Sequence, residues 1–290
     1  MKFDIITDSA SNLPATYADK HDVGIISLQY ILGGEEYDSY AETENSNALK
    51  TFYARMREKV TCTTSNINAA TFEERFTEVL DAGRDFIYVS FSSGLSSSYS
   101  FAKQVGDSLK EKYPDRKFYV IDSLCVTYGL GVLIDYAVKL RKDGKSIDEV
   151  NDWIEDNKLN MCHWFTVDDL FFLKRGGRIS GTTAVAGTLL GIKPFMRVND
   201  EGKLENVTKA RGRKAALTML ADKVIETAVE GKDAVVGIAH GDCTDDAKFV
   251  EKLIKDKLGT KNITIDYLTP IIGAHSGPGT MALFFMGKGR

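Results

Sequence analysis

Short apolar runs alternate with amphipathic helix patterns through the first half of this chain, and the alternation limits the folds it can adopt. Strand-like runs cover residues 3–6, 23–32, 86–91 and 118–121, and helical patterns cover 69–82, 97–113 and 126–142. Residues 146–157 also predict a helix, because Ser146 and Glu149 have the spacing of a capping box. Strands joined by helices make right-handed crossovers, so we predict a mainly parallel sheet sandwiched by helices.

The second half predicts a different architecture. Strands expected at 193–198 and 203–207 flank Asn199-Asp200-Glu201-Gly202, which is a hairpin signal. Further strands are expected at 161–167, 235–240, 263–269 and 282–286, with helices at 212–229 and 245–257. A hairpin mixed with helices indicates an α+β domain with a mixed sheet. We therefore expect an α/β domain at residues 1–160, an α+β domain at 161–290, and a ligand at their interface.

Composition excludes several classes of protein. A net charge of −4 argues against a nucleic-acid binder, which needs a basic face. No run approaches the roughly 20 apolar residues of a membrane span, and no leader pattern begins the sequence, so we expect a cytoplasmic protein. The cysteines, Cys62, Cys125, Cys162 and Cys243, lie far apart, and no cluster has metal-ligand spacing. Neither a metal nor a cofactor is expected.

Hydroxyl-rich segments follow the predicted strands, where ligands of open α/β sheets bind. Ser92-Ser93-Gly94-Leu95-Ser96-Ser97-Ser98 comes between a strand and a helix, and Thr63-Thr64-Ser65-Asn66 precedes another helix. Free N–H groups at helix starts, with hydroxyls beside them, favour an anion such as a carboxylate or a phosphate. Asp122-Ser123 follows the strand expected at 118–121, and there we expect structural capping.

A serine hydrolase is the second interpretation of the same loop. Gly94-Leu95-Ser96-Ser97-Ser98 approaches the nucleophile elbow of α/β hydrolases but lacks its second glycine. His240 with Asp242, or His275, could complete a triad, but no spacing selects them. A binder of a phosphorylated metabolite is the third interpretation.

Basic residues in the second half could face such an anion. Lys174, Arg175 and Arg178 surround Gly176-Gly177, and guanidinium groups suit carboxylates and phosphates. Arg211 and Arg213 flank a glycine where a helix is expected to begin. His275 stands among three glycines and a proline in residues 272–280, for which we predict a tight loop that holds the imidazole against a headgroup.

These segments, in this order, resemble the DegV family of bacterial fatty-acid-binding proteins over essentially the whole chain. The matching motifs are Ile5-Ile6-Thr7-Asp8-Ser9, Thr64-Ser65, Ser92-Ser93-Gly94-Leu95-Ser96, Lys174-Arg175-Gly176-Gly177-Arg178-Ile179, Gly191-Ile192-Lys193-Pro194 and Gly273-Ala274-His275-Ser276-Gly277-Pro278-Gly279. Asn66-Ile67 stands where the family often has Gln-Pro, and Ser97-Ser98 where it often has Gly-Thr.

The resemblance implies a non-catalytic protein that binds a long-chain fatty acid of the palmitate or oleate class between its domains, with the acyl chain in an apolar tunnel of the first domain. Thr64 and Ser96, supported by Ser65 and Ser93, would bind the carboxylate together with His275. Arg178, Arg211 and Arg175 would face the headgroup or a partner. The partner implied is a separate fatty acid kinase, whose acyl phosphate product enters phospholipid synthesis. Transient contact with a membrane surface is compatible with that role.

Overall fold

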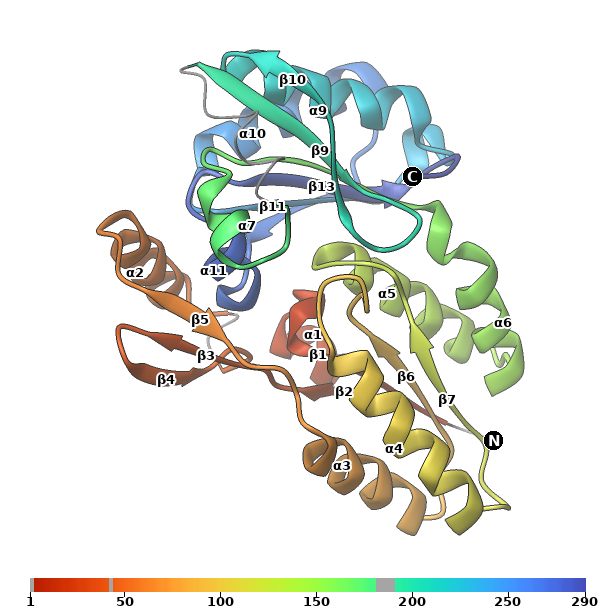
Figure 1. Cartoon of the computed structure of the whole chain (residues 1–290). Coiled ribbons are helices and arrows are strands. Elements are labelled where there is room, and N and C mark those ends of the chain that lie inside the picture. Colours follow the sequence, from red (N-terminus) through yellow and green to blue (C-terminus); the bar gives the residue numbers. More distant parts are fainter. Residues whose placement is uncertain (1–2, 42–43, 181–190) are drawn as a thin grey trace.

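The structure, a computed structural model, describes residues 3–41, 44–180 and 191–290. In Figure 1 the first half of the chain forms the lower group of strands and helices, and the second half forms a separate group of strands and helices above it. No helix in the part of the chain that is described is both long and apolar enough to cross a membrane.

The elements follow the chain in this order. The first half contains β1 (Asp4–Asp8), η1 (Ser9–Ser11), α1 (Ala15–His21), β2 (Val23–Ile26), β3 (Gln29–Leu32), β4 (Glu35–Asp38), α2 (Ser46–Arg57), β5 (Cys62–Thr64), α3 (Ala69–Asp81), β6 (Phe86–Ser90), α4 (Ser98–Lys112), β7 (Phe118–Asp122), α5 (Tyr128–Lys142) and α6 (Ile147–Asn157). The second half contains η2 (Lys158–Asn160), β8 (Met161–Thr166), α7 (Phe171–Arg175), β9 (Ile192–Val198), β10 (Leu204–Arg211), α9 (Arg213–Thr227), η3 (Gly231–Asp233), β11 (Val236–His240), α10 (Thr244–Leu258), β12 (Ile263–Tyr267), α11 (Pro270–Ser276) and β13 (Met281–Met286).

The first sheet is parallel and has the order β2-β1-β6-β7. Alternate side chains of its strands point to opposite faces. Ile5 and Ile87 pack with α5 and α6 on one face, while Ile6 and Tyr88 pack with α3 and α4 on the other. Apolar side chains on both faces explain why helices cover both, as predicted.

The second sheet is mixed and has the order β10-β9-β8-β13-β11-β12, with only β11 and β12 parallel. Helices α9 and α10 cover one face. Phe165, Ala282 and Phe284 lie on the other face and belong to the same apolar cluster as Tyr88 of the first domain. The first domain therefore packs on the face of this sheet that α9 and α10 do not cover. The predicted fold class is confirmed. A boundary near residue 160, where the chain passes from α6 to β8, stays a prediction.

The single strand predicted at 23–32 is wrong. The chain leaves the first sheet after β2, and β3 joins a separate antiparallel sheet of order β4-β3-β5. The Leu28 N–H donates to the Ser9 hydroxyl at 2.9 Å, and the Leu28 carbonyl accepts from the Ser39 N–H. These bonds turn the backbone out of the first ladder, although the apolar pattern continues through the break.

The loop predicted at 272–280 is also partly wrong. Its first residues belong to the helix α11, which has Pro270 in its first turn, a position where a missing N–H costs nothing. Only the residues after Ser276 form a turn, in which Gly277 and Gly279 have φ of 80° and 77°. The helices α1, α2 and α7 were not predicted, although α2 has an N-cap residue, Asn45, that its sequence contains.

A buried carboxyl group at the end of β1 makes the stability of the fold depend on pH. Burial raises the pKa of Asp8 from 3.8 to about 6, although the carboxylate accepts from the N–H groups of Ala10 and Phe91 and from the Tyr88 hydroxyl. Between these two pKa values the folded state binds more protons than the unfolded state. The free energy of unfolding therefore falls as pH rises, by up to roughly 3 kcal/mol from this group.

We expect Asp8→Asn to reduce the difference in unfolding free energy between pH 4.5 and pH 7.5, as measured by urea denaturation. Asp115→Asn, which changes an exposed carboxylate, is the control and should leave that difference as in the wild type. An equal pH dependence in the wild type and Asp8→Asn would contradict the argument.

Candidate functional site

A cavity of about 840 Å³, including its open mouth, lies between the two domains. Its wall is predominantly apolar and comes from both halves of the chain, rather than from the first domain alone. The apolar lining residues are Ala10, Leu28, Phe91, Leu95, Val126, Trp164, Phe165, Leu173, Leu204, Leu268, Ile271, Ile272, Ala282 and Phe284.

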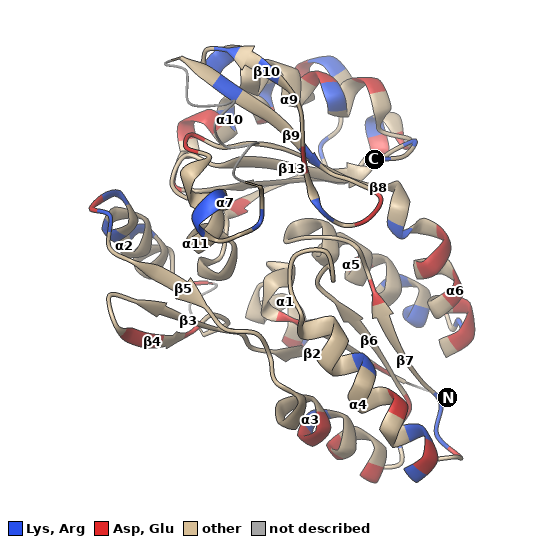
Figure 2. Ribbon diagram, in the orientation of Figure 1, with Lys and Arg blue, Asp and Glu red and all other residues tan. Residues whose placement is uncertain are grey.

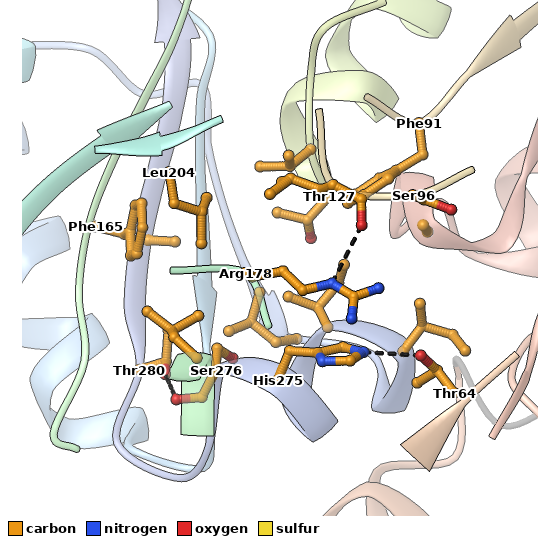
Figure 3. A pocket seen from close by; sticks show the side chains of 18 of the residues that line it. Thr64, Phe91, Ser96, Thr127, Phe165, Arg178, Leu204, His275, Ser276 and Thr280 are labelled. Atoms are coloured by element: carbon orange, nitrogen blue, oxygen red, sulfur yellow. Dashed lines mark hydrogen bonds between the residues drawn. The ribbon is translucent and has the colours of Figure 1, made fainter. Parts of the chain in front are cut away.

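Thr64 and His275 come together at one end of this cavity. The Thr64 Oγ1 and His275 Nε2 lie 2.8 Å apart, which joins β5 of the first domain to α11 of the second, as Figure 3 shows. Burial, reinforced by the charges of Arg178 and Arg175, lowers the pKa of His275 to about 4. The imidazole is therefore neutral at pH 7, with one donor nitrogen and one acceptor nitrogen.

Arg178 extends to the same end of the cavity (Figure 3). Its Nε donates to the Leu95 carbonyl at 3.2 Å, and its Nη1 donates to the Gly176 carbonyl. Burial lowers the pKa of this guanidinium, and no carboxylate of the described residues forms an ion pair with it. A half-buried cation without an anionic partner makes this end of the cavity electropositive.

Ser96 and Asn66 form a hydrogen-bonded pair beside the Thr64–His275 contact. The Ser96 hydroxyl donates to Asn66 Oδ1 at 3.0 Å and accepts from the Ser98 N–H, and the Asn66 amide donates to the Ser97 hydroxyl at 2.7 Å. Asn66 thus joins the loop after β5 to the start of α4. The sequence analysis did not select Asn66, although its position directly after Thr64-Ser65 was a signal.

The loop after β6 also contacts the second domain. The buried Ser92 hydroxyl donates to the Gly202 carbonyl at 2.8 Å, at the tip of the predicted hairpin. A Cβ on Gly94 would lie 2.7 Å from the same carbonyl oxygen. The glycine that suggested a nucleophile elbow therefore permits the two domains to approach closely.

The start of α11 is held by side chains of the first domain. Asn12 donates from its amide to the Tyr267 carbonyl and accepts from the Thr269 N–H, each at 3.1 Å. The Tyr53 hydroxyl donates to the Leu268 carbonyl at 2.8 Å. These bonds fix the helix that carries His275 relative to β5, which carries Thr64.

The structure brings together most of the candidate residues but not all of them. Thr64, Ser65, Ser96, Arg178 and His275 line the cavity.

The other candidates lie elsewhere. Ser93 is exposed, and its N–H donates to Asp122. Arg175 is exposed and stacks on Phe172. Arg211 is exposed at the end of β10, and Gly212 after it is the N-cap of α9, so the helix begins where it was predicted. Neither arginine is among the residues that line the cavity.

Charged side chains are distributed unevenly around the site. In Figure 2 lysine and arginine colour α7 beside the cavity, whereas α11 carries no charged residue.

Asp122 and Ser123 have the structural role expected of them, because the carboxylate accepts from the Leu124 N–H and the hydroxyl accepts from the Cys125 N–H. Among the residues described, no group of His, Cys, Asp and Glu could hold a metal ion.

Fold and cavity together define a protein with an α/β domain and an α+β domain and, between them, a predominantly apolar cavity whose one end is polar and cationic. A family model described as "Uncharacterised protein, DegV family" matches residues 2–288. A DegV domain-containing protein of Clostridium perfringens is 42% identical over 286 residues, which cover 99% of this chain and 98% of that protein. One of Lactococcus lactis is 34% identical over 288 residues and 99% of both chains. The chain belongs to the DegV family.

Solved structures agree with this assignment. A fatty-acid-binding DegV family protein of Streptococcus agalactiae superposes with a TM-score of 0.86 at 25% identity, over 99% of both chains. A Thermus thermophilus DegV family protein described as binding fatty acid gives the same TM-score of 0.86 at 25% identity, over 99% of this chain and 100% of that one. DegV of Bacillus subtilis, described as a fatty acid binding protein, gives 0.82 at 26% identity, over 99% of this chain and 100% of that one.

The ionisation of His275 can be measured directly. We expect its imidazole to remain neutral as pH falls until it titrates near pH 4, because burial and two arginines disfavour the cation. NMR titration of the free, delipidated protein would measure this, with His275→Gln used to assign the resonance. A midpoint near 6.5, the value for a solvated histidine, would show that the site is not desolvated as described.

Proposed function

We propose that this protein binds one long-chain fatty acid in the cavity between its domains, with the carboxylate at the end formed by Thr64, Ser96, Arg178 and His275. The observation that carries the proposal is the half-buried Arg178 guanidinium, which has no carboxylate partner among the described residues although it faces a predominantly apolar cavity. An anion with an apolar tail matches both features, because the tail buries apolar surface and the anion pairs with the cation.

The relatives support the choice of ligand. Those of Streptococcus agalactiae, Thermus thermophilus and Bacillus subtilis are described as fatty-acid-binding proteins, and this chain is similar to each over nearly its whole length. A phosphorylated metabolite is a weaker candidate, because the cavity has few polar groups beyond its cationic end.

The ligand itself is the first test. We expect an organic extract of the purified protein to contain a long-chain fatty acid in a stoichiometric amount, as measured by mass spectrometry. If the purified protein is empty and also fails to bind added palmitate and oleate, the proposal is wrong.

Arg178→Gln tests the headgroup. It should weaken oleate binding by roughly ten- to hundred-fold, the cost of losing a hydrogen bond to a charged partner. Because the free protein has no carboxylate paired with this charge, its unfolding free energy should not fall by a comparable amount. Titration calorimetry and urea denaturation of delipidated protein measure the two quantities. Arg175→Gln is the matched control, since that arginine does not line the cavity, and equal losses in both variants would contradict the assignment.

The contacts of Ser96 do not favour a serine hydrolase. Its hydroxyl bonds to Asn66 and Ser98, and the histidine on the same cavity bonds to Thr64 instead. A nucleophilic serine needs a base within hydrogen-bond reach. We therefore expect a fluorophosphonate probe to leave Ser96 unlabelled, as checked by intact-protein mass spectrometry, and stoichiometric labelling would restore the hydrolase interpretation.

We also propose that this protein does no chemistry itself and presents its fatty acid, in the cytoplasm, to a separate fatty acid kinase whose acyl phosphate product enters phospholipid synthesis. The family resemblance is the support for this step, and exposed Arg175 and Arg211 are candidates to face the partner or, transiently, a membrane surface. Acyl phosphate should form from oleate and ATP only when this protein and a kinase are both present. Formation by the kinase alone at the same rate would contradict a presenting role.

A further inference from the structure

The ring of His275 is packed against a glycine whose backbone conformation does not require glycine. Gly176 has φ of −73° and ψ of −7°, which any residue can adopt. A Cβ at this position would nevertheless lie 2.2 Å from His275 Nδ1 and 3.2 Å from both Cε1 and Cγ. The absence of a side chain therefore serves the contact with the imidazole.

Gly176 offers this imidazole no hydrogen bond. Its N–H donates to the Phe172 carbonyl at 3.0 Å, and its own carbonyl accepts from Arg178. His275 Nδ1 is buried and has no partner among the described residues, whereas Nε2 lies 2.8 Å from the Thr64 hydroxyl oxygen. The two nitrogens of one ring thus have opposite surroundings.

These surroundings decide which nitrogen holds the single proton of the neutral ring. A proton on Nδ1 would be a buried donor without an acceptor, which is unfavourable because the donor has lost its hydrogen bond to water. A proton on Nε2 is donated to Thr64, and Nδ1 is then an unpaired acceptor, whose lone pair is favoured over an unpaired donor by the positive charges of Arg178 and Arg175. The surroundings favour the Nε2–H tautomer.

We propose that Gly176 sets His275 in the Nε2–H tautomer, so that His275 donates to Thr64 and the Thr64 hydroxyl proton is left to point into the cavity. This inference rests on the proposed function for the identity of the bound anion. With the opposite tautomer, Thr64 would donate to His275 and would present only lone pairs to a carboxylate. His275 is thus a positioning residue that acts on the ligand through Thr64.

The tautomer is read from a long-range ¹H–¹⁵N spectrum of the imidazole in free, delipidated wild-type protein at pH 7. The expected result is a proton on Nε2 and none on Nδ1. A proton on Nδ1 would overturn the inference. This measurement needs no ligand, so it decides the inference even if the wild type fails to bind oleate, an outcome that would refute the proposed function instead.

Two pairs of variants test the consequence for binding. Gly176→Ala should weaken oleate binding roughly ten-fold or more, because it displaces the ring that orients Thr64. Gly24→Ala, at a glycine where a Cβ would make only ordinary contacts of 3.4 Å or longer, is the control and should bind as the wild type does.

The second pair separates the two nitrogens. His275→Gln can place an amide N–H near the position of Nε2, whereas His275→Asn places one nearer to Nδ1. We expect His275→Gln to retain more affinity for oleate than His275→Asn. If Gly176→Ala folds, as judged by circular dichroism, and binds oleate as the wild type does, the inference is wrong; equal affinities in the two histidine variants would also overturn it. If Gly176→Ala does not fold, the wild-type spectrum and the histidine pair still decide.

Discussion

The placement of α11 by the first domain is the constraint on which the site depends. Asn12 and Tyr53 hold the three consecutive residues that directly precede this helix, Tyr267, Leu268 and Thr269, through side chain–backbone hydrogen bonds. Such bonds contribute only about 0.5–1.5 kcal/mol each, but a buried group left unpaired costs more, so a shifted helix would be penalised at several groups together. The helix then delivers His275 to Thr64, and a polar contact forms at the end of a cavity that neither domain could form alone.

The same end of the cavity carries an electrostatic cost in the free protein. Arg178 is half-buried, and the backbone carbonyls of Leu95 and Gly176 compensate its charge only in part. Residues that destabilise the free state in this way persist where they serve binding, because the unfavourable term is relieved when an anion arrives. His275 adds no further positive charge to this end of the cavity. Because burial and two arginines keep its ring neutral, it supplies a hydrogen-bonding group alone.

Local patterns predicted much of the fold and part of the site. The capping box of Ser146 and Glu149 marked the start of α6, because both of its contacts lie within one turn. Ser96 was identified because its loop follows a strand, at the sheet edge where ligands of open α/β folds bind, and Thr64 because its segment precedes a helix, whose free N–H groups favour an anion. The break at Ser27 and Leu28 was missed, since it depends on a bond from Leu28 to Ser9 that no periodicity records. Likewise nothing near Gly176 in the sequence indicates that its missing side chain makes room for His275, because the two residues meet only in three dimensions.

The chemistry of the site favours holding a ligand over transforming it. A hydrolytic site needs a nucleophile, a base that takes its proton and a donor set aimed at a developing oxyanion. Here the serine on the cavity wall bonds to an amide and another hydroxyl, and the imidazole on the same wall bonds to a threonine instead. With the ring proton on Nε2, the Thr64 hydroxyl and the Arg178 guanidinium are hydrogen-bond donors directed at one end of an apolar cavity. Hydrogen-bond donors that are not accompanied by a nucleophile and its base stabilise a bound anion in its ground state. Binding a carboxylate requires no more than this.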